Sequence, residues 1–268
     1  MAVAAPARPS AGAATPAGAR FRRALIAAGT FVVFLAIWQL YVATSDSILE
    51  LPTPVSTVRA AIEMTADGDL LPAIASSYSV LAAGAVPGIV VGVLMGLVIG
   101  SVRQLDVAFG PYIFAFFATP FPAVIPLFLL IFGLGFVGKV AIVFTLVWIA
   151  VLLQTIAGVK AVDERYLEVA RSLGTGWLRA TFEIRLPAAL SFIVAGIRIA
   201  VGRALVGVVI AEFDTALTGL GAQIFRHSQR LRLSEALVPA VILALTGIVA
   251  TMLLRRVERR LEVWKQTD

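Results

Sequence analysis

Long runs of apolar residues, separated by short polar segments, make up most of the chain. A helix needs roughly 20 apolar residues to cross a hydrocarbon core of about 30 Å, and a bilayer leaves no backbone polar group unpaired. The pattern therefore predicts an all-α membrane protein with six transmembrane helices, which places both ends of the chain on the same side. The predicted spans are residues 24–44, 76–102, 107–138, 140–159, 187–213 and 236–254.

The third of these runs is uncharged but rich in proline. Pro111, Pro120, Pro122 and Pro126 lie within it. Proline lacks the backbone N–H that a continuing helix needs and clashes with the preceding turn. We therefore expect residues 107–138 to form one broken helix rather than two complete spans.

Composition agrees with a membrane protein and excludes several other classes. Of the 268 residues, 60% are hydrophobic and only 14% are charged, whereas about a quarter are charged in soluble domains. The chain has no cysteine, so a disulfide framework is excluded. Its single histidine, His227, leaves little for metal or acid–base chemistry.

The basic residues are distributed unevenly between the two sides. Fifteen of the 22 lysines and arginines precede the first span or follow the second, fourth and sixth. Because basic residues in short loops stay in the cytoplasm, both termini and the loop at residues 160–187 are predicted to be cytoplasmic. This bias also accounts for the net charge of +6 without a nucleic-acid partner.

We predict one transmembrane domain at residues 21–260, with short cytoplasmic tails. Residues 1–20 are rich in Ala, Pro and Gly, which predicts a disordered tail, and residues 261–268 form the other tail. The first apolar run is longer than the 7 to 15 residues usual for a signal peptide, and no clear A-x-A site follows it. A retained anchor is therefore favoured over a cleaved signal peptide.

The second span carries a glycine every four residues. This spacing aligns positions without side chains along one helix face, where another helix can approach closely. Static helix packing is favoured over a moving interface. The five glycines are Gly84, Gly88, Gly92, Gly96 and Gly100.

The polar loop at residues 160–187 predicts two short helices. Asp163 is a suitable N-cap for a helix over residues 164–173, and Gly174 is a suitable residue after its end. Thr175 could cap a second helix from Trp177 to about Ile184, which we expect to end at Leu186 and Pro187. On the first helix, an apolar face flanked by charges predicts a docking surface for another protein. The residues of this face are Tyr166, Val169, Ala170 and Leu173.

The loop also carries a recognisable spacing. Glu168, Ala170, Gly174, Ile184, Leu186 and Pro187 stand as they do in the EAA loop of permease subunits of ATP-driven importers, and the chain resembles those with the type I (MetI-like) fold. The family usually has alanine where this chain has Val169. Residues 119–139 and 211–224 are similar to permeases for sulfonates, taurine, nitrate and related small organic anions.

The resemblance implies a multi-pass permease of the bacterial cytoplasmic membrane that carries a small solute, with an anion expected. It implies three kinds of partner: a second permease subunit, expected to be an identical copy, two ATPase subunits and an extracytoplasmic binding protein. The chain has no Walker motif, so it is expected not to be an enzyme, and ATP and Mg would bind to the ATPase subunits. Glu168 is expected to contact the ATPase rather than only to cap or solubilise its own helix, and Gly174 is expected to allow a sharp turn.

The fifth span contains three charged residues, Arg198, Arg203 and Glu212. A charge at the bilayer centre costs at least about 2.5 kcal/mol, so each should face protein or water. Together with Pro122 and Pro126 they are candidates for the translocation pathway. For Arg203, an anion-attracting role and an ion pair inside the bundle stay open.

Residues 224–233 alternate apolar side chains with Arg226, His227, Arg230 and Arg232. We expect an outer amphipathic element that anchors to headgroups, in preference to one that meets a binding protein or attracts anions. Two other function classes are less well supported. A secondary transporter for a small anion predicts inverted repeats or several buried acids, and an intramembrane enzyme needs His and Asp clusters.

Overall fold

The computed structural model describes residues 17–45, 51–215 and 217–265, and every regular element within them is helical. The chain divides into two units, residues 1–56 and 57–268. The first contains α1 (Ala17–Thr44), and the second contains the helical bundle described below. Residues 17–20 belong to α1, and α11 (Leu233–Lys265) includes residues 261–265, so parts of both expected tails are helical. Residues 1–16 and 266–268 lie outside the described residues.

Within the described residues, four helical segments are long and apolar enough to span a membrane: α3 (Leu70–Ser101), α6 (Phe136–Lys160), residues 177–215 and the Leu233–Glu258 part of α11. Helix α4 (Arg103–Ala118) and the segment Phe121–Phe132, which contains η1 (Phe121–Val124) and α5 (Ile125–Phe132), are bent by 89° and could count as a fifth. In α1, the apolar stretch Ala28–Thr44 is shorter. The described residues therefore support four or five spans, and the sixth is not confirmed.

The broken span has its break where two of the four prolines lie. Pro120 precedes η1 and Pro122 lies within it, and Pro126 occupies the first turn of α5. Pro111, in contrast, is inside α4 and does not interrupt it. Our expectation that all four prolines interrupt the run is therefore wrong for Pro111.

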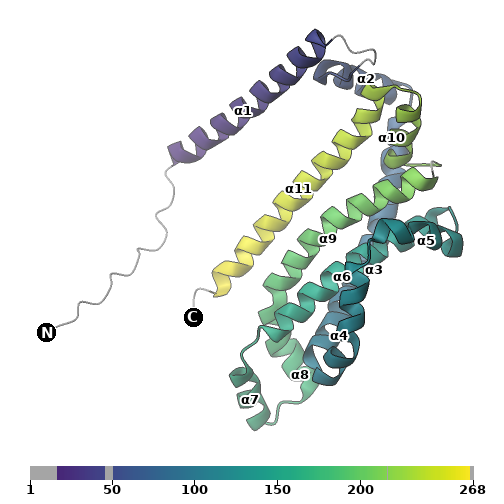
Figure 1. Cartoon of the computed structure of the whole chain (residues 1–268). Helices are drawn as coiled ribbons and strands as arrows, with labels where there is room; N and C mark the ends of the chain where they lie inside the picture. Colours follow the sequence, from purple (N-terminus) through teal and green to yellow (C-terminus); the bar gives the residue numbers. More distant parts are fainter. Residues whose placement is uncertain (1–16, 46–50, 216, 266–268) are drawn as a thin grey trace. The chain divides into compact units, whose positions relative to one another are not determined.

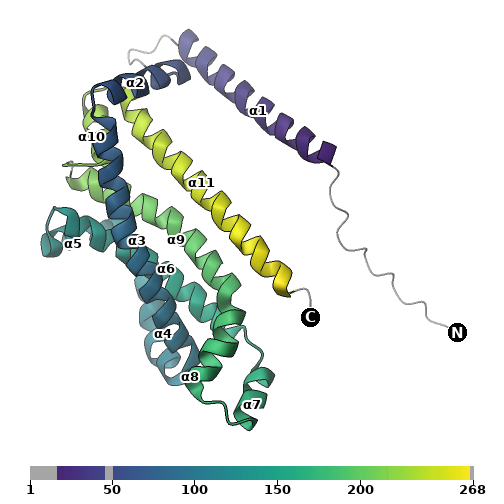
Figure 2. The same ribbon diagram turned by 180° about the vertical axis from the view of Figure 1, so that it is seen from behind.

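The centre of the second unit is formed by α3, α6 and α9 (Leu186–Thr215), which lie side by side in both views (Figure 1 and Figure 2). The glycine stripe of α3 lies directly on α6. A Cβ added to Gly84 would stand 2.7 Å from Val143 Cβ, and one added to Gly92 would stand 2.9 Å from the Trp148 carbonyl oxygen. The five glycines therefore allow the two helices to pack with almost no side chain between them.

The bundle has two different ends (Figure 1). One end carries α7 (Glu164–Ser172) and α8 (Trp177–Ala180). The other end carries α10 (Leu220–Gln229) and the part of α2 (Pro54–Ala66) that belongs to the second unit. There Ala60 and Met64 of α2 pack with Leu220 of α10 and Val238 of α11 in one buried apolar cluster. We call these the α7 end and the α10 end.

A test of the α3–α6 contact compares two glycines. Gly92→Leu should lower the melting temperature of the detergent-solubilised protein, because the added side chain overlaps backbone of α6, and over-packing of this kind costs about 1–3 kcal/mol or more. Gly202→Leu is the matched control, since a Cβ at Gly202 meets nothing within 4 Å. Equal melting temperatures for the two variants would contradict this account of the stripe.

Candidate functional site

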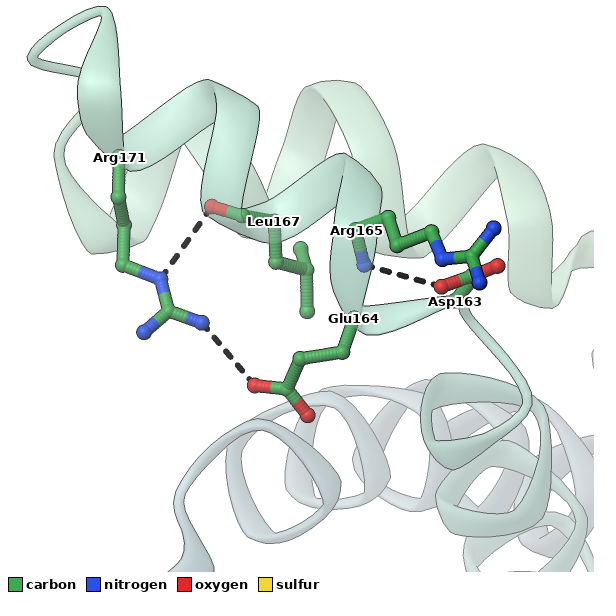
Figure 3. Close-up of polar contacts among 5 residues, drawn as sticks. All are labelled: Asp163, Glu164, Arg165, Leu167 and Arg171. Atoms are coloured by element: carbon green, nitrogen blue, oxygen red, sulfur yellow. Dashed lines mark hydrogen bonds and ion pairs between the residues drawn. The ribbon is translucent and has the colours of Figure 1, made fainter.

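The short helix α7 is held together by its own polar side chains (Figure 3). The Asp163 carboxylate accepts a hydrogen bond from the Arg165 amide at 2.9 Å, which caps the helix as predicted. The Arg171 guanidinium donates to Glu164 at 3.0 Å and to the Leu167 carbonyl at 3.2 Å. These bonds make α7 a regular helix although it has only nine residues.

The turn after α7 depends on Gly174. Its φ of 74° lies in the left-handed region, which glycine adopts without strain. Its amide donates to the Arg171 carbonyl at 3.0 Å, and the next amide, of Thr175, donates to the Ala170 carbonyl at 2.9 Å. This pattern is the helix-ending arrangement that the sequence predicts for Gly174.

The two sides of α7 have different surroundings. Leu167 and Ala170 are buried against the rest of the second unit. Tyr166, Val169 and Leu173 are 68%, 59% and 79% exposed, and they lie outside the helical segments that are long and apolar enough to span a membrane. The predicted apolar face is thus present, but Ala170 lies at its edge, on the side of the helix that is buried. We call Tyr166, Val169 and Leu173 the α7 face.

Glu168 is also exposed. Within the described residues its carboxylate has no hydrogen bond or ion pair, and the cap of α7 is Asp163. Capping its own helix is therefore not the role of Glu168, and the side chain is available to a partner.

The second predicted short helix differs from our expectation. Its N-cap is Gly176 rather than Thr175, and α8 runs without a break into the π-helix η2 (Thr181–Arg185) and then into α9. Pro187 is the second residue of α9 and does not end a helix. The wider π turn provides the room that a proline ring needs in a continuing helix.

Ile184, Leu186 and Pro187 therefore belong to this junction and not to the α7 face. Ile184 is half-buried and Pro187 is exposed. Leu186 packs against a buried cluster that includes Leu97, Val159 and Ala189.

A buried polar cluster lies at the α10 end. The Glu212 side chain is 0% exposed. Its two carboxylate oxygens accept hydrogen bonds from the Ser77 hydroxyl, each at 2.8 Å, and one also accepts from the Gly221 amide at 2.8 Å. The Ser77 hydroxyl in turn accepts from the Leu220 amide at 2.7 Å. Through these bonds α9 and α3 hold the start of α10.

Lys139 completes this cluster. Its side chain is buried near Glu212, and its ammonium donates to the carbonyl and the hydroxyl of Thr218, both at 3.1 Å. A buried carboxylate without donors or a nearby opposite charge would be strongly destabilising. Here two donors, the Ser77 hydroxyl and the Gly221 amide, and one nearby cation meet that need.

The turn before α10 fits Glu212 because it contains glycines. Gly219 has a φ of 104°, and a Cβ there would overlap the Glu212 carboxylate. A Cβ on Gly221 would stand 2.7 Å from the Val209 carbonyl oxygen. The G-L-G sequence of this turn thus follows from the close approach of backbone to a buried acid.

The charged residues predicted to line a pathway have separate surroundings. Arg198 forms an ion pair with Glu258 of α11 at 2.6 Å, and Glu212 is enclosed in packing. Neither presents its charge on an open surface. The Arg203 guanidinium lies 4.3 Å from the ring centroid of Phe117, at the end of α4, and has no ion pair within the described residues. Pro122 and Pro126 are exposed beside the break.

The predicted outer element is two pieces rather than one. Helix α10 ends at Gln229, and Arg230 and Arg232 lie exposed beyond it. Arg226 donates to the Leu217 carbonyl at 3.1 Å. Burial lowers the pKa of His227 from its usual value, the nearby Glu235 opposes this, and the neighbouring arginines add to it.

Comparison with known families is decisive for the class of protein. Residues 88–263 match the binding-protein-dependent transport system inner membrane components. The chain belongs to this family. The permease is therefore a multi-pass inner-membrane component of an ABC importer and not an enzyme. A system of this kind includes ATPase and binding-protein partners. The family also excludes the secondary-transporter alternative.

Three relatives are similar to the permease along most of their length. A candidate aliphatic sulfonates transport permease protein, SsuC, of Bacillus subtilis (strain 168) is 30% identical, over 88% of this chain and 86% of SsuC. The taurine transport system permease protein TauC of Escherichia coli (strain K12) is 26% identical, over 91% of this chain and 90% of TauC. The formylaminopyrimidine transport permease protein ThiX of Halalkalibacterium halodurans is 25% identical, over 88% of this chain and 94% of ThiX.

Sequence reasoning missed two members of the buried polar cluster of this permease. Lys139 directly precedes the fourth predicted span and Ser77 lies within the second, and no motif singles out either residue. Ser77 lies 135 residues from Glu212 along the chain, so local spacing could not connect them. The available signal was that an isolated intramembrane acid requires buried donors.

The cluster can be tested with two acids of the permease that lie close together. Glu212→Ala should destabilise the protein by about 3 kcal/mol, because it removes the counter-charge of a buried cation and leaves two donors without their acceptor. Asp214→Ala is the control, since Asp214 is exposed. The measurement is the melting temperature of the solubilised permease, and a loss no larger than that of the control would contradict the holding role of Glu212.

Proposed function

We propose that this permease forms half of the translocation pathway of an importer for a small anion, and that ATPase subunits drive it through the α7 face and Glu168. A second copy of the chain would form the other half. ATP and Mg would be bound by the two ATPase subunits. The binding protein would deliver substrate at the α10 end, so the α7 end and both termini would be cytoplasmic. In this arrangement α1 provides the sixth span.

The observation that carries the proposal is the α7 face itself. It presents three large apolar side chains to solvent on a helix that is capped by Asp163. Exposed apolar groups with charged neighbours are typical of protein-protein contacts. Glu168 adds an unpaired charge beside them, which can select the orientation of a partner.

The route from α7 to the far end of the bundle is continuous. Leu167 and Ala170 of α7 are buried, and α8, η2 and α9 form one helical segment from Trp177 to Thr215. Glu212, near the end of this segment, is bonded to α3 and α10. Movement of α7 with an ATPase subunit would therefore pass through the short turn at residues 173–176 into one helical segment that extends to the α10 end.

The charge of the substrate is inferred from Arg203. A guanidinium in the middle of a span is costly unless it has a partner, and within the described residues Arg203 has only the Phe117 ring. Stacking on a ring leaves the N–H donors of a guanidinium in place to bind an anion. The names of two relatives, which concern sulfonates and taurine, are consistent with this, whereas that of ThiX is not.

The docking role predicts a large effect of one charge reversal. Glu168→Lys should reduce the amount of ATPase subunit that co-purifies with the permease about tenfold. This change corresponds to ~1.4 kcal/mol of binding free energy. Asp214→Lys, a reversal of an exposed acid at the α10 end, should leave the amount unchanged. Both variants should insert normally in the membrane. Wild-type amounts of ATPase with Glu168→Lys would refute the proposal.

The anion role of Arg203 predicts a separate result. In proteoliposomes with the cognate ATPase and binding protein, Arg203→Met should reduce uptake of a transported anion about tenfold, with taurine, methanesulfonate and nitrate as the probes. Arg203→Lys should retain part of the uptake because it keeps the charge. If Arg203→Met transports these anions at the wild-type rate, the anion role is wrong although the ATPase coupling stands.

A further inference from the structure

A polar cavity of about 310 Å³ lies at the α7 end, between the α3–α4 junction and the base of α7. It is separate from the α7 face and from Arg203. Five helical elements contribute to its wall: α3, α4, α6, α7 and η2. The polar residues that line it are Ser101, Arg103, Asp106, Lys160, Glu164 and Arg185.

The charges of this cavity do not cancel. Asp106 is paired with Lys160 at 2.6 Å, and Glu164 is paired with Arg171 at 3.0 Å. Both acids are thus neutralised by cations other than Arg103 and Arg185. Within the described residues neither arginine forms an ion pair, although Glu164 acts on Arg185 electrostatically. The Arg185 side chain donates one long hydrogen bond, of 3.4 Å, to the Thr181 hydroxyl.

Two further features favour a negative ligand. The Ser101 hydroxyl is buried and has no hydrogen-bond partner within the described residues. Helix α4 begins beside it at Arg103, and its N-cap, Val102, provides no side-chain acceptor. The positive end of a helix and its amides attract anions, and a phosphate is a common occupant of such an end.

We propose that this cavity binds a phosphate group. Two guanidinium groups can each form paired hydrogen bonds to phosphate oxygens, and the free hydroxyl can donate a further bond. The cavity is lined by apolar residues as well, Val159, Val162 and Leu167. This mixture suits the headgroup of an anionic phospholipid, and inorganic phosphate has the same recognisable chemistry.

A bound phosphate would connect α4 of the broken span to the segment that carries α7. Ser101 lies at the end of α3, Arg103 in the first turn of α4, and Arg185 at the end of η2. The phosphate would therefore join α3 and α4 to the helical turn that follows the proposed coupling helix. This consequence depends on the proposed function, but the binding site does not.

The test uses the purified full-length permease without its ATPase subunit, so that failure of ATPase coupling cannot affect it. The melting temperature in detergent is measured with added phosphatidylglycerol, with phosphatidylcholine of the same acyl chains, and with sodium phosphate against sodium chloride at equal ionic strength. We expect a rise of several degrees with phosphatidylglycerol or phosphate that Arg185→Gln and Arg103→Gln each reduce at least twofold. The additive that stabilises the wild type, phosphatidylglycerol or sodium phosphate, identifies whether the phosphate group comes from a lipid or from free phosphate.

Arg179→Gln is the matched control, because Arg179 is an exposed arginine of α8, near η2, that is paired with Glu183 and does not line the cavity. It should keep the full rise. Ser101→Ala is a much smaller change and should also weaken the rise. It serves as the test if the arginine variants fold poorly. The proposal is overturned if neither additive stabilises the wild type beyond its neutral counterpart, or if the cavity variants and the control respond equally.

Discussion

The close contact between α3 and α6 is the constraint on which the rest of the structure depends. In a bilayer the hydrophobic effect does not drive helices together, so packing must come from complementary surfaces. Five glycines on α3 meet a row of β-branched residues on α6, and a Cβ at Gly84 or Gly92 would stand under 3 Å from α6 atoms. The valines of this row, Val143, Val147 and Val151, are themselves completely buried.

This rigid pair gives the other elements fixed places to attach. Helix α9 packs on α6, and its two ends carry different chemistry. At one end it continues through η2 and α8 toward the exposed α7 face. At the other end, Glu212 is bonded to Ser77 of α3 and to the amide of Gly221. The permease thus joins a surface suited to a protein partner to a polar cluster at the opposite end through one helical segment.

Much of this could be predicted from the sequence, because bilayer thickness and helix periodicity impose strict patterns. The glycine spacing, the Asp163 cap, the Gly174 turn and the break near Pro120 follow from local rules. Local rules do not predict which side of α7 is buried. Ala170 lies between the buried side and the α7 face, and only its surroundings in the folded protein decide whether it is buried. Residues whose partners are distant in sequence were also beyond local reasoning, as Ser77 with Glu212 and Arg198 with Glu258 demonstrate.

The π turn at Thr181–Arg185 has a consequence for how this chain can change in evolution. A π turn accommodates one residue more than an α-helical turn of the same rise, and each residue of an α-helix rotates the chain by about 100°. Deleting one residue there would make the helix regular and leave Trp177 and everything before it close to its present orientation about the axis of α9, whereas a deletion elsewhere in α9 would rotate that part by about 100°. The five positions of the π turn should therefore tolerate the loss of a single residue better than the α-helical positions on either side of them.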